Sequence, residues 1–325
     1  VGSYLLLEQP VRRSGLRTRP TLALGGASVA AVVVVALLAP TTGVVVDTAG
    51  EAGTAAAIDR DGPTTPLEVE QVEPAIPTAG QDPEEVWRAL DLEPPTPDRP
   101  VRIVVFGDST AKATGGGLAR WAAAHPDLAQ VTVDGAAGCG FVRGGVRVFP
   151  EREQEVPVSC GTYVDEDLAR ATAELRPDVV LFLTGGWDIV DQRFPGTEAL
   201  APTDDEYRQR IRDGFADATA NVLDAGAPKV VWLAEPTSDP YWNPVVSPQE
   251  DPARHEVLHQ AMRELAAADP ARVAVADLGW WLTESGMASD HAARPDGVHL
   301  TAEAAEEVST RWLGPVALGA ALSAS

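Results

Sequence analysis

The sequence predicts an α/β protein built on a parallel β-sheet with helices on both faces. From residue 101 onward, short apolar segments of strand length alternate with longer segments of helical composition. The short segments are apolar almost throughout, which is typical of strands covered on both sides. Sheets of this kind bind ligands at the carboxyl ends of their strands. Functional residues are therefore expected in the segments that follow the strands.

Five strands and five helices are expected within a domain that covers residues 101–315. The expected strands are the segments 102–106, 130–133, 178–183, 229–233 and 272–276. The expected helices are the segments 118–124, 165–175, 204–225, 253–268 and 301–313. The glycine-rich sequence TGGGLA, residues 114–119, is expected to bend the chain before the first helix resumes. Residues 316–325 are expected to form a C-terminal tail.

The first 100 residues are expected to anchor this domain to a membrane. Residues 21–39 carry no charged side chain and, as a helix, would span about 28 Å, close to the hydrocarbon thickness of a bilayer. Four arginines within residues 1–20 place that end in the cytoplasm and everything after residue 40 outside. A cleaved signal peptide is the alternative. Residues 40–100, rich in proline and threonine, are expected to form an extracytoplasmic linker.

The amino-acid composition limits the kinds of binding partner and the cellular compartment that we expect for the protein. The net charge of −23 argues against nucleic acid as a partner. The two cysteines, Cys139 and Cys160, can form one disulfide in an oxidising compartment. Two buried thiols are the alternative. No metal or cofactor is expected.

The segments beyond three of the strands carry the residue types of nucleophilic catalysis. Such catalysis needs a hydroxyl, an imidazole that takes its proton, a carboxylate that orients the imidazole, and N–H groups that stabilise the oxyanion. Ser109 follows the first strand and offers the hydroxyl and an N–H, and Gly138 follows the second and offers another N–H. His299 and Asp296, beyond the fifth strand, offer the base and its carboxylate. The alternative is that Ser109 merely caps a helix.

Two of these segments resemble a known family. The sequence FGDST near the start of the domain and DGVHLT near its end resemble the first and last blocks of the SGNH (GDSL-type) hydrolases. The resemblance covers about residues 100–313. It implies a three-layer, flavodoxin-like fold with a five-stranded parallel sheet. It also implies Ser109 as nucleophile, Asp296 and His299 as its partners, and Gly138 as the oxyanion glycine, with Gly140 or Gly135 as alternatives.

The third block departs from that family. Its usual sequence is Gly-x-Asn-Asp, whose asparagine donates to the oxyanion, but this chain has GGWD, with Trp187 in the asparagine position. We therefore expect an oxyanion hole made by Ser109 and Gly138 alone, and weak esterase activity. Trp187 and Asp188 are expected to contact the substrate, with simple packing as the alternative for the tryptophan.

The N-terminal sequence SYLLLEQPVRR resembles the end of the membrane domain of acyltransferase family 3. Proteins that fuse this domain to an extracytoplasmic SGNH domain are implicated in O-acylation, usually O-acetylation, of surface glycans. The resemblance implies that residues 1–20 are the tail of such a membrane domain, which would deliver the acyl donor. Ser109 would then pass the acyl group to a glycan hydroxyl. A carbohydrate esterase and a non-catalytic glycan-binding domain are the alternatives.

A zinc peptidase is a further alternative. The sequence HEVLH matches the H-E-x-x-H signature, with His255 and His259 as ligands and Glu256 as the base. Asp277 or Glu284 would be the third ligand. The same stretch also has the pattern of an ordinary amphipathic helix, which is the interpretation we favour.

Overall fold

A computed structural model describes residues 57–62, 65, 67, 97–241, 243 and 245–322. The predicted membrane helix at 21–39, the segment 1–20 before it and most of the linker lie outside these residues. Within the described part of the chain, no helix is both long and apolar enough to cross a membrane.

The predicted five-stranded parallel sheet is confirmed. Its strands are ordered β2-β1-β5-β8-β9, which is the flavodoxin-like order, and all neighbours are parallel. Each lies within two residues of its predicted bounds. The chain order reverses next to β1, so the carboxyl ends of β1, β2 and β5 surround the crevice where such folds bind ligands. The strands are β1 (Val101–Gly107), β2 (Ala129–Gly135), β5 (Val179–Leu183), β8 (Val230–Ala234) and β9 (Val273–Asp277).

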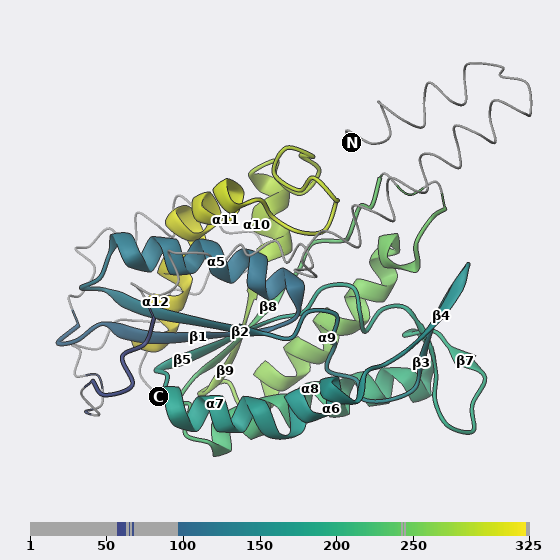
Figure 1. Cartoon of the computed structure of the whole chain (residues 1–325), viewed down its shortest axis with the longest axis horizontal. Helices are drawn as coiled ribbons and strands as arrows, with labels where there is room; N and C mark the ends of the chain where they lie inside the picture. The colour runs from purple at the N-terminus through teal and green to yellow at the C-terminus, as the bar shows by residue number, and fades with distance from the viewer. Residues whose placement is uncertain are drawn as a thin grey trace, which may run out of the picture. The chain divides into compact units, whose positions relative to one another are not determined.

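Helices cover both faces of this sheet, as predicted (Figure 1). Residues of β1 alternate between two cores, with Ile103 and Val105 in one and Val104 and Phe106 in the other. The first core contains residues from α5 (Ser109–Ala124), α10 (Leu278–Glu284), α11 (Ala302–Val308) and α12 (Gly314–Leu322). The second contains residues from α7 (Leu168–Leu175), α8 (Asp205–Asp224) and α9 (Pro252–Ala268). Short helical segments complete the set: α6 (Val158–Thr162), η2 (Tyr163–Asp167), η3 (Pro248–Glu250) and η4 (Ser309–Leu313).

Two predictions about helix ends are wrong. The TGGGLA sequence does not bend the chain, because α5 is helical from Ser109 onward. A Cβ at Gly117 would lie 2.1 Å from the carbonyl oxygen of Ala305, so this glycine lets α5 approach α11 closely. The predicted tail begins instead as α12, whose residues Val316 and Ala317 are fully buried. The near absence of polar residues in α12 explains why it lies in the core.

A second, four-stranded antiparallel sheet was not predicted. Its order is β4-β3-β6-β7, and its strands come from the segments that follow β2 and β5. These strands are short and partly charged, so they lack the apolar signal of the main sheet. They are β3 (Val146–Phe149), β4 (Arg152–Glu155), β6 (Asp191–Arg193) and β7 (Ala199–Leu200).

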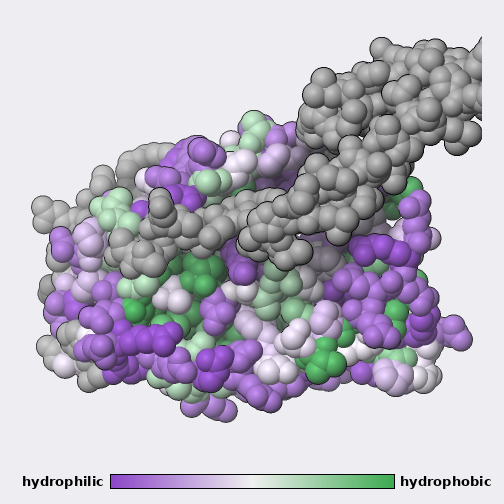
Figure 2. All heavy atoms as spheres, in the orientation of Figure 1, coloured by the Kyte–Doolittle hydropathy of each residue, from purple (hydrophilic) through white to green (hydrophobic). Residues whose placement is uncertain are grey.

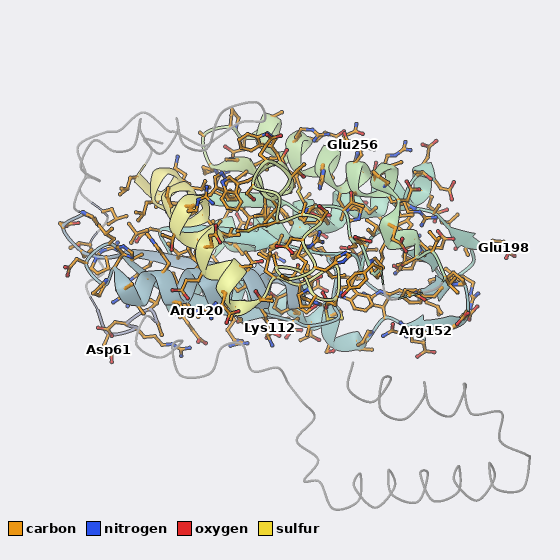
Figure 3. The ribbon with its side chains drawn as sticks, turned by 90° about the horizontal axis from the view of Figure 1, so that it is seen from above. Asp61, Lys112, Arg120, Arg152, Glu198 and Glu256 are labelled. Carbon is orange, nitrogen blue, oxygen red and sulfur yellow. A yellow bond between two sulfur atoms is a disulfide. The ribbon has the colours of Figure 1, made fainter. Side chains whose placement is uncertain are left out.

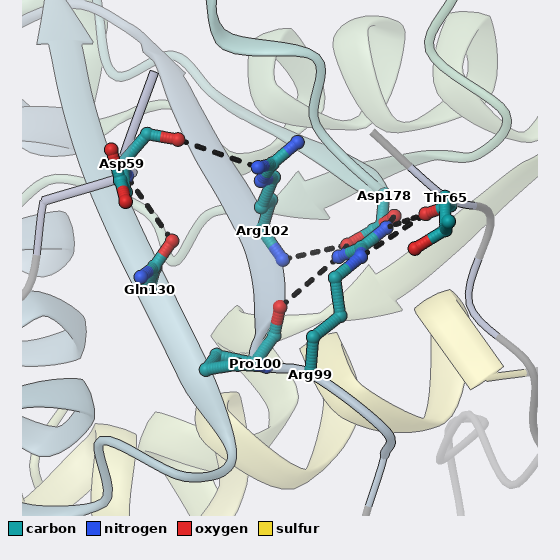
Figure 4. Close-up of polar contacts among 7 residues, drawn as sticks. All are labelled: Asp59, Thr65, Arg99, Pro100, Arg102, Gln130 and Asp178. Carbon is teal, nitrogen blue, oxygen red and sulfur yellow. Dashed lines mark hydrogen bonds and ion pairs between the residues drawn. The ribbon is translucent and has the colours of Figure 1, made fainter. Parts of the chain in front are cut away.

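Part of the predicted linker packs on the domain (Figure 4). Ile58 is buried in the second core, and the N–H of Asp59 donates to the side chain of Gln130. Arg99 donates to both carboxylate oxygens of Asp178, at 2.7 and 2.8 Å. The domain therefore begins before the predicted boundary at residue 101 and includes the segment around Ile58.

The visible surface of the domain is largely polar. The face drawn in Figure 2 is mostly hydrophilic, with apolar residues scattered over it. Among the described residues, the large hydrophobic side chains that are exposed are Val158, Tyr241 and Val246. Single exposed apolar residues of this kind are normal on protein surfaces.

Candidate active site

The structure brings Ser109, His299 and Asp296 together in a hydrogen-bonded chain. His299 Nε2 lies 2.8 Å from Ser109 Oγ, and His299 Nδ1 lies 2.6 Å from Asp296 Oδ2. Ser109 and His299 are 190 residues apart in the sequence. This is the order of groups that a serine nucleophile, its base and the orienting carboxylate require.

The Asp-x-x-His spacing works because the segment is a tight turn. Asp296 Oδ1 accepts from the N–H groups of Val298 and His299, which leaves Oδ2 facing the imidazole. Gly297 has a φ of +73°, and a Cβ there would lie 1.5 Å from the carbonyl oxygen of Asp239. The N–H of Asp239 in turn donates to the carbonyl of Gly297. Only glycine therefore fits this turn, and Asp239 holds it from the loop after β8.

The helix-cap alternative for Ser109 is resolved by its neighbour. Asp108 is the N-cap of α5, and its Oδ1 accepts from the N–H and hydroxyl of Thr110. Its Oδ2 accepts from the N–H of Gly185, at 2.8 Å, which ties the end of β1 to the loop after β5. Ser109 is the first helical residue, and its hydroxyl is left for His299. Asp108 stands directly before the nucleophile, and its capping role was not predicted from the sequence.

The electrostatics of the turn favour a charged pair. Burial opposes the imidazolium form of His299, but the hydrogen bond and charge of Asp296 outweigh it and raise the pKa of His299 above its ordinary value. Burial also opposes the ionised form of Asp296, but hydrogen bonds from the His299 side chain and backbone lower the pKa of Asp296 well below its usual range. Asp296 therefore stays ionised and stabilises the imidazolium that would form when His299 takes a proton.

The loop after β2 presents Gly138 to open space. Gly138 has a φ of +83°, and nothing lies within 4 Å of where its Cβ would be. Within the described part of the chain, its N–H has no hydrogen-bond acceptor. The alternatives are enclosed, because a Cβ at Gly140 would lie 2.0 Å from Asp188 and one at Gly135 would lie 2.8 Å from the backbone of Asp108. Of the three glycines, Gly138 is the one with no atom close to its Cβ position.

Arg147, which was not predicted as a site residue, holds this loop. The guanidinium is buried, and its Nη1 donates to the carbonyl oxygen of Gly138 at 2.8 Å. The same guanidinium lies 4.6 Å from the ring centroid of Trp187. Trp187, which replaces the family's asparagine, is thus linked to the Gly138 loop through Arg147, and it is partly exposed. A lone arginine in the unpredicted strand β3 gave no sequence signal.

Asp188 does not lie where the sequence analysis expected it. We expected it to contact the substrate, but it is buried, and its two oxygens accept from the N–H groups of Phe141 and Val142. Burial raises the pKa of Asp188 to about 6, because backbone hydrogen bonds and the charge of Arg147 only partly offset the cost of desolvation. Asp188 therefore positions the loop that carries Gly138.

Two further covalent and polar links fix the same region. Cys139 and Cys160 form a disulfide, which joins the residue after Gly138 to α6. Tyr163, also missed from the sequence, donates its hydroxyl to the carbonyl of Asp134 and accepts from the N–H of Gly107. The ends of β1 and β2 are thereby tied together beside Ser109.

The HEVLH sequence does not have the arrangement of a zinc peptidase. Glu256, the expected base, is 61% exposed, pairs with Arg263 and lies at the outside of the molecule (Figure 3). The acid that approaches His255 and His259 is Glu235, and neither Asp277 nor Glu284 joins that group. The zinc-peptidase alternative is therefore wrong: Glu256 pairs with Arg263 at the surface and does not join the two histidines as a base would, and the acid of their group is Glu235.

Residues 79–314 match the family model described as "SGNH domain (fused to AT3 domains)". No curated protein sequence is significantly similar to the chain. Similar solved structures include a lipase/acylhydrolase from Enterococcus faecalis (19% identity, TM-score 0.43, covering 66% of this chain and 95% of that one). They also include a carbohydrate acetylesterase family member from Sinorhizobium meliloti (14% identity, TM-score 0.44, covering 67% of this chain and 99% of that one). A third is the acetyl xylan esterase AlAXEase (13% identity, TM-score 0.41, covering 66% of this chain and 100% of that one). Because the family model spans most of the sequence, the chain belongs to the family of SGNH domains that are fused to AT3 domains.

Proposed function

We propose that this chain is the extracytoplasmic part of a membrane-bound serine O-acyltransferase that acylates a cell-surface glycan. The observation that carries the chemistry is the hydrogen-bonded chain from Asp296 through His299 to Ser109. The family's fusion to AT3 domains supports transfer, because a membrane partner domain can supply an activated acyl group to this site. In this proposal residues 21–39 form the membrane anchor.

The reaction proceeds through an acyl-enzyme. Ser109 Oγ attacks the acyl carbonyl of the donor while His299 Nε2 takes the hydroxyl proton. The N–H groups of Ser109 and Gly138 stabilise the negative oxygen of the tetrahedral intermediate. His299 then gives its proton to the departing donor group. A glycan hydroxyl next attacks the ester, His299 takes its proton, and Ser109 regains it as the acylated glycan leaves.

A carbohydrate esterase is the second candidate. The side chain of His299 is 36% exposed, so water can reach the same base that would activate a sugar hydroxyl. Because Trp187 replaces the family's asparagine, the proposed oxyanion hole has two donors, the N–H groups of Ser109 and Gly138. We expect hydrolysis to be slow, since loss of one donor costs about 3 kcal/mol of transition-state stabilisation. The two functions share the acyl-enzyme and differ only in the acceptor.

The first experiment tests whether Ser109 is activated. The full chain is treated with a fluorophosphonate and examined by intact mass and peptide mapping, with Ser285→Ala as a control for an unrelated serine and His299→Ala as the inactive variant. An adduct on Ser109 that His299→Ala abolishes supports the proposal. Unchanged labelling of His299→Ala, or no adduct on a folded chain, would sink it and leave a binding domain.

The second experiment separates transfer from hydrolysis. The chain is given an activated acetyl ester with and without an acceptor oligosaccharide, and both free acetate and acetylated sugar are measured by mass spectrometry. Transfer predicts acetylated sugar that depends on Ser109. Free acetate alone, at a rate that the oligosaccharide does not change, would assign the chain as an esterase.

A further inference from the structure

A buried cluster of Glu235, His255 and His259 lies outside the candidate active site. Glu235 directly follows β8, and the two histidines lie one turn apart on α9. The side chains of Glu235 and His255 are 4% and 2% exposed, and that of His259 is 18% exposed. One ligand atom from each of the three lies within 4.8 Å of the other two. A carboxylate as deeply buried as that of Glu235 needs a positively charged partner.

The hydrogen bonds of His255 define which of its nitrogens faces the cluster. His255 Nε2 lies 2.9 Å from the carbonyl oxygen of Gln249, which can only accept, so Nε2 carries a hydrogen. The other nitrogen, Nδ1, lies 2.9 Å from Glu235 Oε1. In a neutral imidazole with its hydrogen on Nε2, Nδ1 has no hydrogen, and its lone pair faces the carboxylate of Glu235. Two acceptors are stable at this distance only with a proton or a metal ion between them.

A second contact of the same kind lies beside the first. His259 Nε2 lies 3.5 Å from Glu235 Oε2. Both atoms are buried, and neither has a hydrogen-bond partner within the described part of the chain. Two imidazole nitrogens and both oxygens of one carboxylate therefore converge on the same space.

We infer that Glu235, His255 through Nδ1 and His259 through Nε2 bind a divalent transition metal ion, with zinc as the best match. Zinc takes imidazole nitrogen and carboxylate oxygen at about 2.0–2.2 Å, so its ligand atoms lie roughly 3–4 Å apart. The contacts of 2.9 and 3.5 Å are of this size, and one ligand atom from each of the three residues lies within 4.8 Å of the other two. The hydrogen bond from His255 to the Gln249 carbonyl is the outer contact that orients a zinc-bound histidine.

The position of the cluster indicates a structural role. A metal ion here would join the end of β8 to α9. Gln249, whose carbonyl accepts from His255, also donates its side-chain amide to the carbonyl of Gly186 at 2.7 Å. Gly186 precedes Trp187 in the loop after β5. The ion would therefore hold, through His255 and Gln249, one of the loops that border the candidate active site.

Zinc titration of the full chain tests this inference. Metal is stripped with EDTA, the chelator is removed, and ZnCl₂ is added while bound zinc and the Tm are measured, with Mg²⁺ as the negative control. We expect one zinc per chain and a higher Tm, because the ion binds only the folded chain. His259→Gln should weaken zinc binding at least about tenfold. His291→Gln, at an exposed histidine paired with Asp239, should leave it unchanged.

Two results overturn the inference. One is the absence of zinc binding by the folded chain, which would assign the cluster as a proton-sharing carboxylate–imidazole group. The other is equal affinity in His259→Gln and wild type, which would place the zinc elsewhere. If His259→Gln does not fold, the visible spectrum of the Co²⁺-loaded wild type decides, since nitrogen and oxygen ligands in tetrahedral geometry give intense bands. Fluorophosphonate labelling of Ser109 reports separately on the proposed function.

Discussion

Replacing Asp296 by asparagine keeps His299 in place but changes which of its ring nitrogens carries the proton, so it tests the role of Asp296 in orienting the base. Asparagine keeps the shape of the side chain and an oxygen that can accept from the N–H groups of Val298 and His299, as Asp296 Oδ1 does at 2.9 and 2.7 Å. The amide NH₂ then faces Nδ1, where Asp296 Oδ2 accepts at 2.6 Å in the wild type. Nδ1 must now accept, so the single proton of the neutral imidazole moves to Nε2.

That change of tautomer removes the base. With a hydrogen on Nε2, His299 donates to Ser109 Oγ instead of accepting its proton. The corresponding change in a serine protease triad lowers the rate by about 10⁴, which is about 5 kcal/mol in activation free energy. The pH dependence shifts as well. Asp296 raises the pKa of His299, and burial alone lowers it, so the acidic limb of the rate profile should move to lower pH in the variant.

The rate of fluorophosphonate labelling of Ser109 between about pH 5 and 9 measures both effects. Asp290→Asn is the matched control, because Asp290 is an exposed aspartate nearby whose Oδ1 accepts from the N–H of Ala292. We expect a loss of about 10⁴ for Asp296→Asn and no change for Asp290→Asn. A loss below tenfold, with the acidic limb unmoved, would refute the assignment of Asp296 as the orienting carboxylate.

Three more predictions concern the loop that carries Gly138. Gly138→Ala and Gly144→Ala both place a Cβ in open space at positive φ (+83° and +70°), so similar backbone strain is expected. Alanine keeps the backbone N–H, so Gly138→Ala should slow labelling only as far as relief of that strain turns the N–H away from the oxyanion, up to the factor of about 10²–10³ that loss of one donor costs; equal rates in the two variants would contradict a specific role of the Gly138 peptide. Reducing the Cys139–Cys160 disulfide should lower the unfolding free energy by about 3 kcal/mol, measured by denaturant titration with and without reductant. The pKa of Asp188 is raised from 3.8 to about 6 in the folded chain, so wild type should lose up to about 3 kcal/mol of stability relative to Asp188→Asn as pH rises from about 4 to 6. If the stability difference between wild type and Asp188→Asn does not change with pH, the raised pKa of Asp188 is contradicted.

The main sheet and the Ser109–His299 pair were predictable because their signals are local. A run such as residues 101–107 is short, rich in β-branched residues and apolar at nearly every position, which is typical of a strand buried on both faces. The sequences FGDST and DGVHLT place Ser109 and His299 next to predicted strand and helix boundaries. The parallel topology then brings the two segments to one edge of the sheet, although 190 residues separate them.

The misassigned parts depend on contacts that no local pattern encodes. Glycines at 115–117 lower helix propensity, so the start of α5 resembled a bend, but Gly117 is required there by the backbone of α11. Asp188 has the sequence position of a substrate contact. It is buried because the loop from Gly138 to Val142 folds over it, and that loop has no secondary-structure signal.

In the proposed mechanism, contacts of Arg147 and Asp188 with the loop that carries Gly138 offset the lack of the family's asparagine. Arg147 on β3 holds the carbonyl of Gly138 and stacks on Trp187, the residue in the asparagine position. Asp188, directly after Trp187, holds the backbone at Phe141 on the other side of the same loop. Arg147 from the unpredicted strand β3 and Asp188 from the loop after β5 thus hold both ends of the loop that is proposed to supply the oxyanion donor. A donor held rigidly in this way costs little reorganisation during the reaction, which is the property that makes such donors effective. If Gly138 is the oxyanion donor, as proposed, the substitution of Trp187 for asparagine exchanges one direct donor for a more rigid placement of the Gly138 N–H.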